Sequence, residues 1–318
     1  MPSTEQALLA ARRPYLELRC RIVQAVRSFF FERGFLEIQT PVRTPAPAPE
    51  SHIDAMSVED GWFLVTSPEL YMKRLLAAGY SKIFQITPVF RREEQGRLHH
   101  PEFTLLEWYR LHADYGALRE DCQQLLRAAW KAAGHGDAWD YRGRRLEMDG
   151  EWELLTVKEA FARFADWEPG ADVNQDRFDL DLVEKVEPHL GFPRPCILAD
   201  YPANQAALSR LKPGDPSVAE RFELYWAGIE LANGFSELTD AVEQRHRFES
   251  TLEMRHRAGR PAYPLPESFL GSIEHLPPCA GIALGMDRLI MILSGADHLD
   301  QVVAFPPGLE MQELRERG

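Results

Sequence analysis

The spacing of apolar residues along the chain predicts a mixture of helices and strands. Helical spacing recurs in four segments, residues 12–33, 118–133, 156–164 and 241–258. Period-two alternation or a continuous apolar run predicts five strand segments, residues 35–39, 82–90, 102–110, 196–202 and 222–238. Segments 137–145 and 262–278 are predicted loops, and residues 166–190 form an acidic, loosely helical segment. These elements predict an α/β fold of the α+β type.

Two of the predicted strands, 82–90 and 102–110, are expected to pair as a hairpin. The polar loop between them carries Arg91, Arg92, Glu93, Glu94, Arg97, His99 and His100. In the second strand the side-chain period of two places Phe103, Leu105, Glu107 and Tyr109 on one face. An apolar face that ends in a carboxylate and a phenol suits a pocket wall better than a core. The alternative is an exposed hairpin with a solvated, charged turn.

A second candidate lies in the segment GIELANGFSELTD, residues 228–240. Asn233-Gly234 is typical of a type I′ hairpin turn, in which both central residues need positive φ. A turn there would place Glu230 opposite Glu237, which is destabilising unless a cation lies between or beside them. The cation could be a divalent metal, which prefers oxygen ligands, or a substrate ammonium. Alternatively, both carboxylates point into water.

A third candidate lies in the segment GIALGMDRL, residues 281–289. Gly281 and Gly285 bracket a short apolar strand, and a helix is predicted to begin near Met286. Arg288 would lie in its first turn, where a guanidinium can clamp a phosphate beside the helix N-terminus. Two glycines four residues apart are also common in ordinary buried turns.

Composition narrows the class of protein. The chain has 318 residues and a net charge of −13, from 36 basic and 49 acidic residues. This balance weighs against broad non-specific binding to nucleic acid. No apolar run is long enough for a membrane span, and the N-terminus lacks a secretory core. The four cysteines are widely spaced, as in reduced cytoplasmic proteins. No repeat or linker is visible, so residues 1–318 are predicted to form one domain.

Together the three segments resemble the motifs of class II aminoacyl-tRNA synthetases. The first hairpin carries F-R-x-E and P-E-F-T-x-L-E-W-Y, the lysine-type form of motif 2. Residues 12–41 resemble the helix, strand and proline of motif 1, and G-x-D-R-L resembles motif 3. The resemblance implies a mostly antiparallel sheet flanked by helices, a homodimer, and ATP with Mg²⁺. The implied reaction forms an aminoacyl adenylate, which then transfers its acyl group to an acceptor.

The resemblance also implies roles for individual residues. The catalytic arginines would be Arg91 and Arg288. Contacts to ATP would come from Arg91, Arg92, Glu93, His100, Glu230, Leu231, Gly285 and Arg288. The amino acid would be bound by Ser67, Pro68, Glu69, Glu107, Tyr109, Glu237 and Ala283, and the acidic pair Glu230 and Glu237 would be the metal candidates. His100 departs from the family, which normally has Asn there, although imidazole can also donate a hydrogen bond.

Two departures from full-length lysyl-tRNA synthetases narrow the resemblance. The chain begins almost at the motif 1 helix, so an N-terminal anticodon-binding domain is expected to be absent. Ala283 stands where those enzymes typically have glycine. Both features resemble the free-standing paralogues that attach β-lysine to elongation factor P, and tRNA is then not expected as a partner. Two alternatives remain: a minimal enzyme that charges lysine tRNA, and a non-catalytic paralogue that binds an amino acid.

Overall fold

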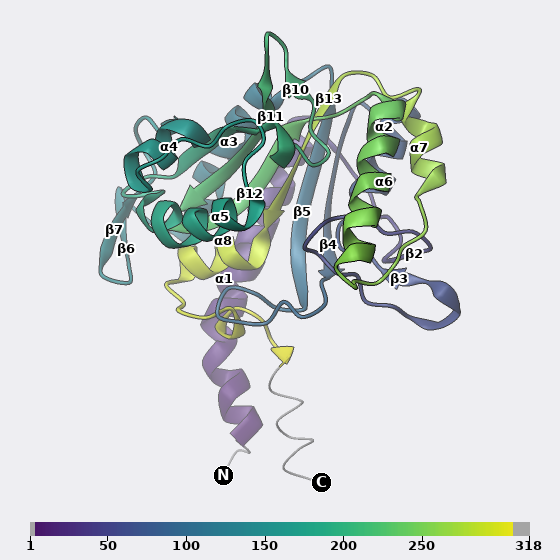
Figure 1. Ribbon diagram of the computed structural model, residues 1–318. Helices are drawn as coiled ribbons and strands as arrows, with labels where there is room; N and C mark the ends of the chain where they lie inside the picture. Colours follow the sequence, from purple (N-terminus) through teal and green to yellow (C-terminus); the bar gives the residue numbers. More distant parts are fainter. Residues whose placement is uncertain (1–3, 308–318) are drawn as a thin grey trace.

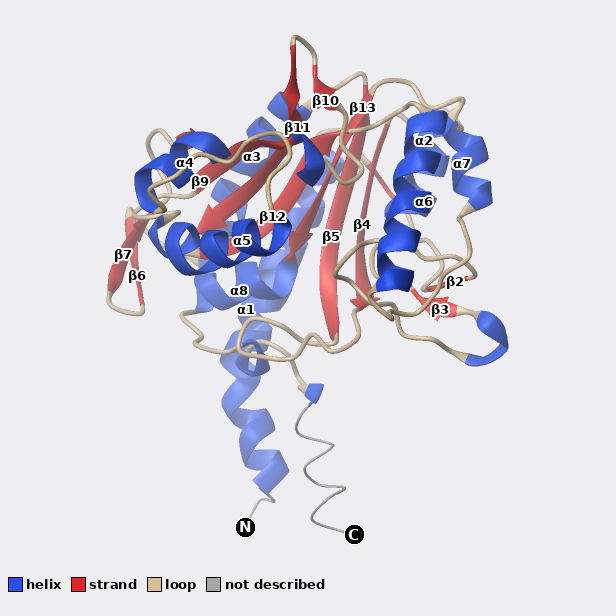
Figure 2. Ribbon diagram, viewed as in Figure 1, coloured by secondary structure: helices blue, strands red, loops and turns tan. Residues whose placement is uncertain are grey.

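The computed structural model describes residues 4–307, which contain a nine-stranded sheet (Figures 1 and 2). Across the sheet the strands follow in the order β1 (Leu36–Glu37), β4 (Lys82–Phe90), β5 (Glu102–Leu111), β13 (Cys279–Gly285), β12 (Ile229–Ser236), β11 (Asp215–Trp226), β9 (Cys196–Pro202) and β8 (Glu153–Thr156), and β10 (Leu211–Lys212) pairs with β11. β1 is parallel to β4 and β8 to β9, whereas the other neighbours are antiparallel. The expected mostly antiparallel sheet is therefore confirmed.

One face of the sheet is covered by α1 (Thr4–Glu32), α3 (Tyr115–Ala133) and α8 (Met286–Ser294). These helices and the inner strands share the largest apolar core, which includes Ile22, Phe30, Phe84, Trp108 and Ile290. Phe30 stacks on Phe84 with ring centroids 4.6 Å apart, which fixes α1 against β4. Complete burial of each such side chain stabilises the fold by about 1.5–3 kcal/mol.

The opposite face carries two separate groups of helices (Figure 2). The first group is α2 (Glu69–Ala77), α6 (Ala241–Arg257) and α7 (Glu267–Ile273), on the β4–β5 side. The second is α4 (Val157–Phe164) and α5 (Gln175–Asp181), followed by a π-helical turn at Leu182–Val186 and a 3₁₀ turn at Glu187–His189, on the β8–β9 side. Parts of β5, β13 and β12 lie between the two groups. Two small sheets complete the fold, β2 (Arg43–Thr44) with β3 (Phe63–Leu64), and β6 (Ala138–Tyr141) with β7 (Arg144–Glu147).

Side-chain caps fix where several helices begin. Asp114 Oδ1 accepts hydrogen bonds from two backbone N–H groups in the first turn of α3, at 2.9 and 3.1 Å. Asp240 does the same for α6. Thr156 and Glu159 form the expected capping box at the start of α4. A cap of this kind contributes about 1 kcal/mol to stability.

The hairpin of β11 and β12 turns at Ala227-Gly228, so the predicted turn at Asn233-Gly234 is wrong. Ala227 and Gly228 have φ values of 57° and 72°, the positive values that a type I′ turn requires. Asn233 and Gly234 lie inside β12. A Cβ on Gly234 would come within 2.9 Å of the Cβ of Ile282, so the glycine allows close packing inside the sheet.

The shifted turn also overturns the predicted pairing of Glu230 with Glu237. Glu230 is paired with Tyr225, near the start of β12. Glu237 lies just beyond the other end of the strand, where it bridges to Ser209. Seven residues of extended chain span about 23 Å, so these two carboxylates do not share one cation.

Two predicted loops contain regular structure. Residues 137–145 are mostly the hairpin of β6 and β7, whose turn residues Arg142 and Gly143 have φ values of 55° and 75°. An arginine rarely adopts positive φ, so the sequence gives no turn signal there. Residues 262–278 include α7, which packs Phe269, Leu270 and Ile273 into a small apolar cluster. Among residues 4–307, no helix is both long and apolar enough to cross a membrane.

Candidate active site

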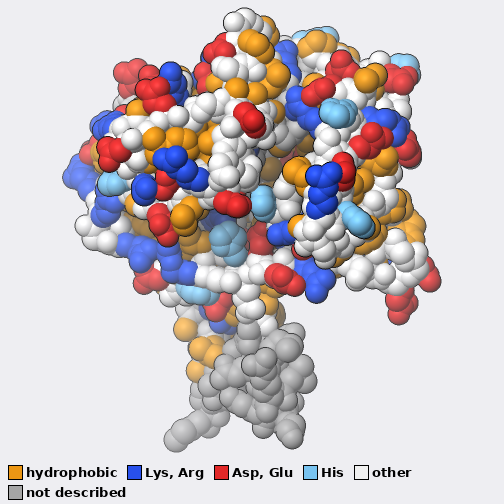
Figure 3. All heavy atoms as spheres, in the orientation of Figure 1, with side chains coloured by type: hydrophobic (Ala, Val, Ile, Leu, Met, Phe, Trp, Pro, Cys, Tyr) orange, Lys and Arg blue, Asp and Glu red, His pale blue; other side chains and the backbone are white. Residues whose placement is uncertain are grey.

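Most of the expected site residues gather on the face between the two helix groups, where Figure 3 shows acidic, basic and histidine side chains close together. They form two clusters. The carboxylate pocket comprises Ser67, Glu69, Lys73, Glu107, Tyr109 and Glu237. The guanidinium cluster comprises His99, Glu187, Arg221, Glu223, Tyr225, Glu230 and Arg288.

Glu107 is the centre of the carboxylate pocket. Ser67 Oγ donates to Glu107 Oε1 at 2.6 Å, and the Tyr109 hydroxyl donates to Glu107 Oε2 at 2.8 Å. Ser67 Oγ also accepts from the backbone N–H of Glu69, which joins β5 to the start of α2. Burial raises the pKa of Glu107 to about 8, and the nearby charge of Glu69 adds to the effect.

A single buried ammonium faces three carboxylates in this pocket. Lys73 Nζ lies 2.5 Å from Glu69 Oε1 and forms a second ion pair with Glu237. Burial raises the pKa of Glu237 well above its usual value, although Lys73 opposes the shift. Glu237 Oε1 has no hydrogen-bond partner among the described residues. With Glu107 included, three carboxyl groups face one ammonium. The raised pKa values of Glu107 and Glu237 mean that protons balance the excess acids, and a second ammonium would be able to replace those protons.

β13 forms the wall of the pocket beside β5. In the register of these strands, Gly281 is paired with Tyr109 and Ala283 with Glu107. A Cβ on Gly281 would lie 2.1 Å from the Tyr109 ring and 2.5 Å from Glu237 Oε1, so only glycine permits both side chains to occupy their places. Ala283, two residues later, packs against the apolar cluster of Val65, Val89 and Leu105.

Arg288 connects three segments in the guanidinium cluster. It lies in the first turn of α8, as expected, and its Nη1 donates to the backbone carbonyl of Glu230 at 2.8 Å. The Glu230 carboxylate lies 3.4 Å from the same nitrogen. Arg288 Nε donates to the Leu98 carbonyl, and Nη2 lies 2.7 Å from His99 Nε2. Burial lowers the pKa of His99, and the charge of Arg288 lowers it further, so a neutral ring is favoured.

An acidic group next to Arg288 was missed by the sequence analysis. Glu223 accepts hydrogen bonds from Arg221 at 2.6 Å and from the Tyr225 hydroxyl at 2.7 Å. Burial raises the pKa of Glu223, and Glu230 adds to the shift. Burial likewise raises the pKa of Glu187 to about 7, with contributions from Glu230 and Glu223. Converging, partly neutralised carboxylates are a donor set that suits Mg²⁺.

The loop between β4 and β5 holds Arg91 and Arg92 in different environments. Arg91 is half-buried, stacks over the Phe103 ring at 5.0 Å, and leaves its Nε without a hydrogen-bond partner in the described structure. Arg92 and Glu93 pair with each other at 3.2 Å near the loop tip, with exposed side-chain fractions of 54% and 75%. The structure therefore does not bring Arg92 and Glu93 to the clusters, and their contacts with ATP stay predictions.

Three of the remaining expected residues belong to elements that carry the clusters, whereas His100 bonds to a residue outside them. Pro68 precedes α2, Leu231 is buried in β12, and Gly285 caps α8. A Cβ on Gly285 would meet only ordinary contacts, the nearest at 3.7 Å from Arg288, so packing alone does not require this glycine. His100 is buried and bonded to Asp300.

Lys73, Glu187, Arg221 and Glu223 are functional candidates that the sequence analysis did not identify. The sequence does contain a signal for two of them. Arg221 and Glu223 are two residues apart in β11, so the period of two places both side chains on one face of that strand, which ends at the turn Ala227-Gly228. No comparable pattern marks Lys73, whose partners lie far from it in sequence except Glu69.

Comparison with known proteins identifies the family. The family model of class II tRNA synthetases (D, K and N) matches residues 8–308, which is nearly the whole chain. The chain belongs to this family. The expected synthetase-like fold is therefore confirmed by both the match and the sheet.

Curated relatives cover almost the full length of the chain. A protein of Edwardsiella ictaluri named elongation factor P–(R)-β-lysine ligase is 41% identical over 303 residues, covering 90% of this chain and 93% of its own. Proteins of the same name from Vibrio cholerae and Salmonella gallinarum are 39% and 41% identical, each covering 92% of this chain and 94% of its own. The predicted resemblance to this group is thus confirmed, and with it an enzyme of the ligase class.

Proposed function

We propose that this protein activates (R)-β-lysine with ATP and transfers the β-lysyl group to a lysine side chain of elongation factor P. The observation that carries the proposal is the carboxylate pocket, which has three acids for one lysine. It lies on the same sheet face as Glu223 of the guanidinium cluster, because the strand registers pair Glu107 with Ala283, Ala283 with Asn233, and Asn233 with Glu223. Relatives about 40% identical over about nine-tenths of the chain carry the corresponding name.

In the pocket, Glu107 and Glu237 would bind an ammonium of the substrate, and Tyr109 would orient Glu107. The carboxylate pocket thereby fixes the amino acid at one end and leaves its carboxylate free to approach ATP. Holding two reactants in this way lowers the entropic part of the barrier. Ala283 would place one methyl group at the pocket wall, and a difference of this size discriminates by about 1–3 kcal/mol.

At the guanidinium cluster, Arg288 would neutralise charge on the phosphates, together with Arg91 from the β4–β5 loop, whose charge already acts on His99. The substrate carboxylate oxygen forms a bond to the α-phosphorus, the bond from that phosphorus to the β-phosphate bridge breaks, and pyrophosphate leaves. Glu223 and Glu230 would hold Mg²⁺, and Glu187 lies near both. When bound, this ion supplies further positive charge against the phosphate oxygens. No protein nucleophile is needed, because the chemistry rests on positioning and charge.

In the second step, the uncharged amine of an acceptor lysine attacks the acyl carbon of the adenylate. An amide bond forms, AMP leaves, and the amine loses one proton to solvent. Homodimerisation is part of the proposal, because Phe31, Leu36 and Val42 near the end of α1 and β1 are 54%, 51% and 40% exposed. Paired copies could cover this apolar surface.

The proposal is tested by pyrophosphate exchange with (R)-β-lysine and α-lysine side by side, followed by mass analysis of elongation factor P. Exchange that prefers β-lysine, together with a β-lysyl mass increase on elongation factor P, is the expected result. Robust charging of lysine tRNA without modification of elongation factor P would instead favour a minimal tRNA-charging enzyme. Absence of exchange with either isomer would favour a non-catalytic paralogue.

A further inference from the structure

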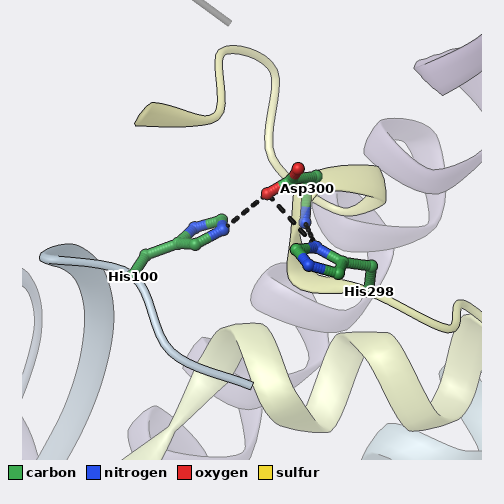
Figure 4. Close-up of side chains that lie close together, drawn as sticks. All are labelled: His100, His298 and Asp300. Atoms are coloured by element: carbon green, nitrogen blue, oxygen red, sulfur yellow. Dashed lines mark hydrogen bonds and ion pairs between the residues drawn. The ribbon is translucent and has the colours of Figure 1, made fainter. Parts of the chain in front are cut away.

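Three potential metal ligands meet away from the two clusters, where the β4–β5 loop contacts the 3₁₀ turn η5 (Leu299–Gln301). His100 Nε2 lies 2.8 Å from Asp300 Oδ1, and His298 Nδ1 lies 3.2 Å from the same oxygen (Figure 4). One ligand atom from each residue lies within 4.8 Å of the other two. We propose that His100, His298 and Asp300 bind one divalent transition-metal cation, for which Zn²⁺ is the best match.

The hydrogen bonds of His298 supply the first argument. Its Nδ1 lies 3.2 Å from Asp300 Oδ1 and also 3.2 Å from the backbone nitrogen of Asp300. A cation between Nδ1 and Oδ1 would be attracted by both atoms. Because Nδ1 has one in-plane lone pair, binding the cation would replace its contact with the backbone N–H.

The donor set supplies the second argument. Two imidazoles and a carboxylate are preferred ligands of Zn²⁺ and related ions, whereas Mg²⁺ and Ca²⁺ prefer oxygen alone. Ligands bound about 2.1 Å from a tetrahedral Zn²⁺ lie about 3.4 Å apart. Here the two spacings to Asp300 Oδ1 are 2.8 and 3.2 Å, and all three ligand atoms lie within 4.8 Å of one another. His100 is buried, whereas the side chains of His298 and Asp300 are 41% and 45% exposed, so an ion can enter from solvent.

An ion bound at this site would hold the β4–β5 loop in place. The loop already contacts the segment of η5, because Leu299 N–H donates to the Arg97 carbonyl at 3.2 Å and Arg97 Nη1 donates to the Asp297 carbonyl at 3.3 Å. His100 follows His99, which contacts Arg288. A bound ion would therefore fix the end of the loop next to the guanidinium cluster. The site is distinct from the acidic group of Glu223, Glu230 and Glu187.

The test is a titration of the full-length protein with Co²⁺, a spectroscopic probe for Zn²⁺ sites, in the presence of excess Mg²⁺. We expect one equivalent to produce the intense visible absorption of a four-coordinate Co²⁺ ion, and Zn²⁺ to abolish that absorption. Mg²⁺ should not compete, because imidazole is a poor ligand for it. Absence of this spectrum in the wild-type protein, or competition by Mg²⁺, would overturn the proposal.

Two variants locate the ion and one serves as a control. His298→Ser retains an N-cap oxygen for the turn but removes the imidazole, and Asp300→Asn removes the charge without changing the shape. Each is expected to weaken Co²⁺ binding by about 100-fold while the circular dichroism spectrum stays unchanged. His246→Ala, which removes an exposed histidine on α6, should bind Co²⁺ like the wild type. Equal Co²⁺ affinity in all four proteins would show adventitious binding and refute the site.

Discussion

The carboxylate pocket and the guanidinium cluster hold their charges in opposite ways. Lys73, Glu107 and Glu237 are at most 2% exposed and come from regular elements or their immediate ends. Arg288 and Glu230 have side chains 20% and 37% exposed, and their neighbour His99 comes from a loop. Charges in the pocket therefore interact through a medium of low polarity, whereas Arg288 and Glu230 are partly screened by water. The pocket is preorganised around one cation, whereas Arg288 keeps part of its guanidinium accessible to solvent.

The largest expected effect comes from the cluster. Arg288→Ala should reduce pyrophosphate exchange by about 10³-fold, because no other residue supplies its guanidinium at the start of α8. The side chain also joins α8 to β12 and to the β4–β5 loop, so some fall in melting temperature is expected, and exchange is measured well below the melting temperature of the variant. Arg257→Ala, which removes an arginine that is 73% exposed on α6, is the control and should retain full exchange. Near-normal exchange by Arg288→Ala would contradict the role in phosphate binding.

A substitution in the carboxylate pocket should have a smaller effect, and it should change the KM for the amino acid. Glu237→Gln removes a carboxylate that is proposed to bind the substrate ammonium, so the KM for β-lysine should rise by about 100-fold, while the KM for ATP stays within about twofold. Steady-state exchange kinetics with each substrate varied in turn measure both constants. Glu253→Gln on the surface of α6 is the matched control. A parallel rise in both KM values would mean that the two clusters are not separable.

The pH dependence sharpens the same contrast. The pKa of Glu107 is about 8 in the folded protein and 4.5 in its ordinary state, so the folded state binds the extra proton. Its contribution to stability is complete below pH 4.5 and is lost as the pH rises to about 8. A substrate ammonium favours the carboxylate, so affinity for β-lysine should increase over the upper part of this window, by up to about tenfold per pH unit.

Calorimetric titration with β-lysine between pH 6 and 8.5 measures this dependence. In the Glu107→Gln variant, the part of the pH dependence due to this carboxyl should disappear, and binding should be weaker at the upper end. An unchanged slope in the variant would show that another group controls the proton release.

The smallest expected effect concerns selectivity within the pocket. Ala283→Gly removes one methyl group beside Glu107, and the preference for β-lysine over α-lysine should fall by about tenfold. The ratio of kcat/KM for the two isomers in pyrophosphate exchange measures this preference. The Arg288 contacts are untouched, so the KM for ATP should not change. An unaltered ratio would remove Ala283 from the specificity argument.

The sequence predicted the elements with the strongest local signals. β4, β9 and the start of α8 are where the pattern placed them, because each has a clear apolar period and defined ends. The juxtaposition of Glu107 and Tyr109 was also predictable, since a period of two is a local property of β5. The placement of Ser67 and Glu237 around them was expected from the resemblance alone.

The errors arose where tertiary packing decides the outcome. Gly234 serves close packing against Ile282, and Ala227 adopts a positive φ that its side chain does not favour, so the dipeptide signal pointed to the wrong turn. Lys73 was not predicted as a site residue because its ion pair with Glu237 joins two residues that are distant in the chain. Local patterns do not contain information about such long-range partners.

The glycine at position 281 limits how this enzyme can change its substrate. Any side chain there would displace both Tyr109 and Glu237, which are proposed to surround the substrate amine. Evolution or engineering of a new amino-acid preference must therefore act elsewhere, and position 283 is the nearest point on the same strand where a methyl group is already tolerated. Position 281 thus has to remain glycine for Tyr109 and Glu237 to keep their places, whereas position 283 accepts a side chain.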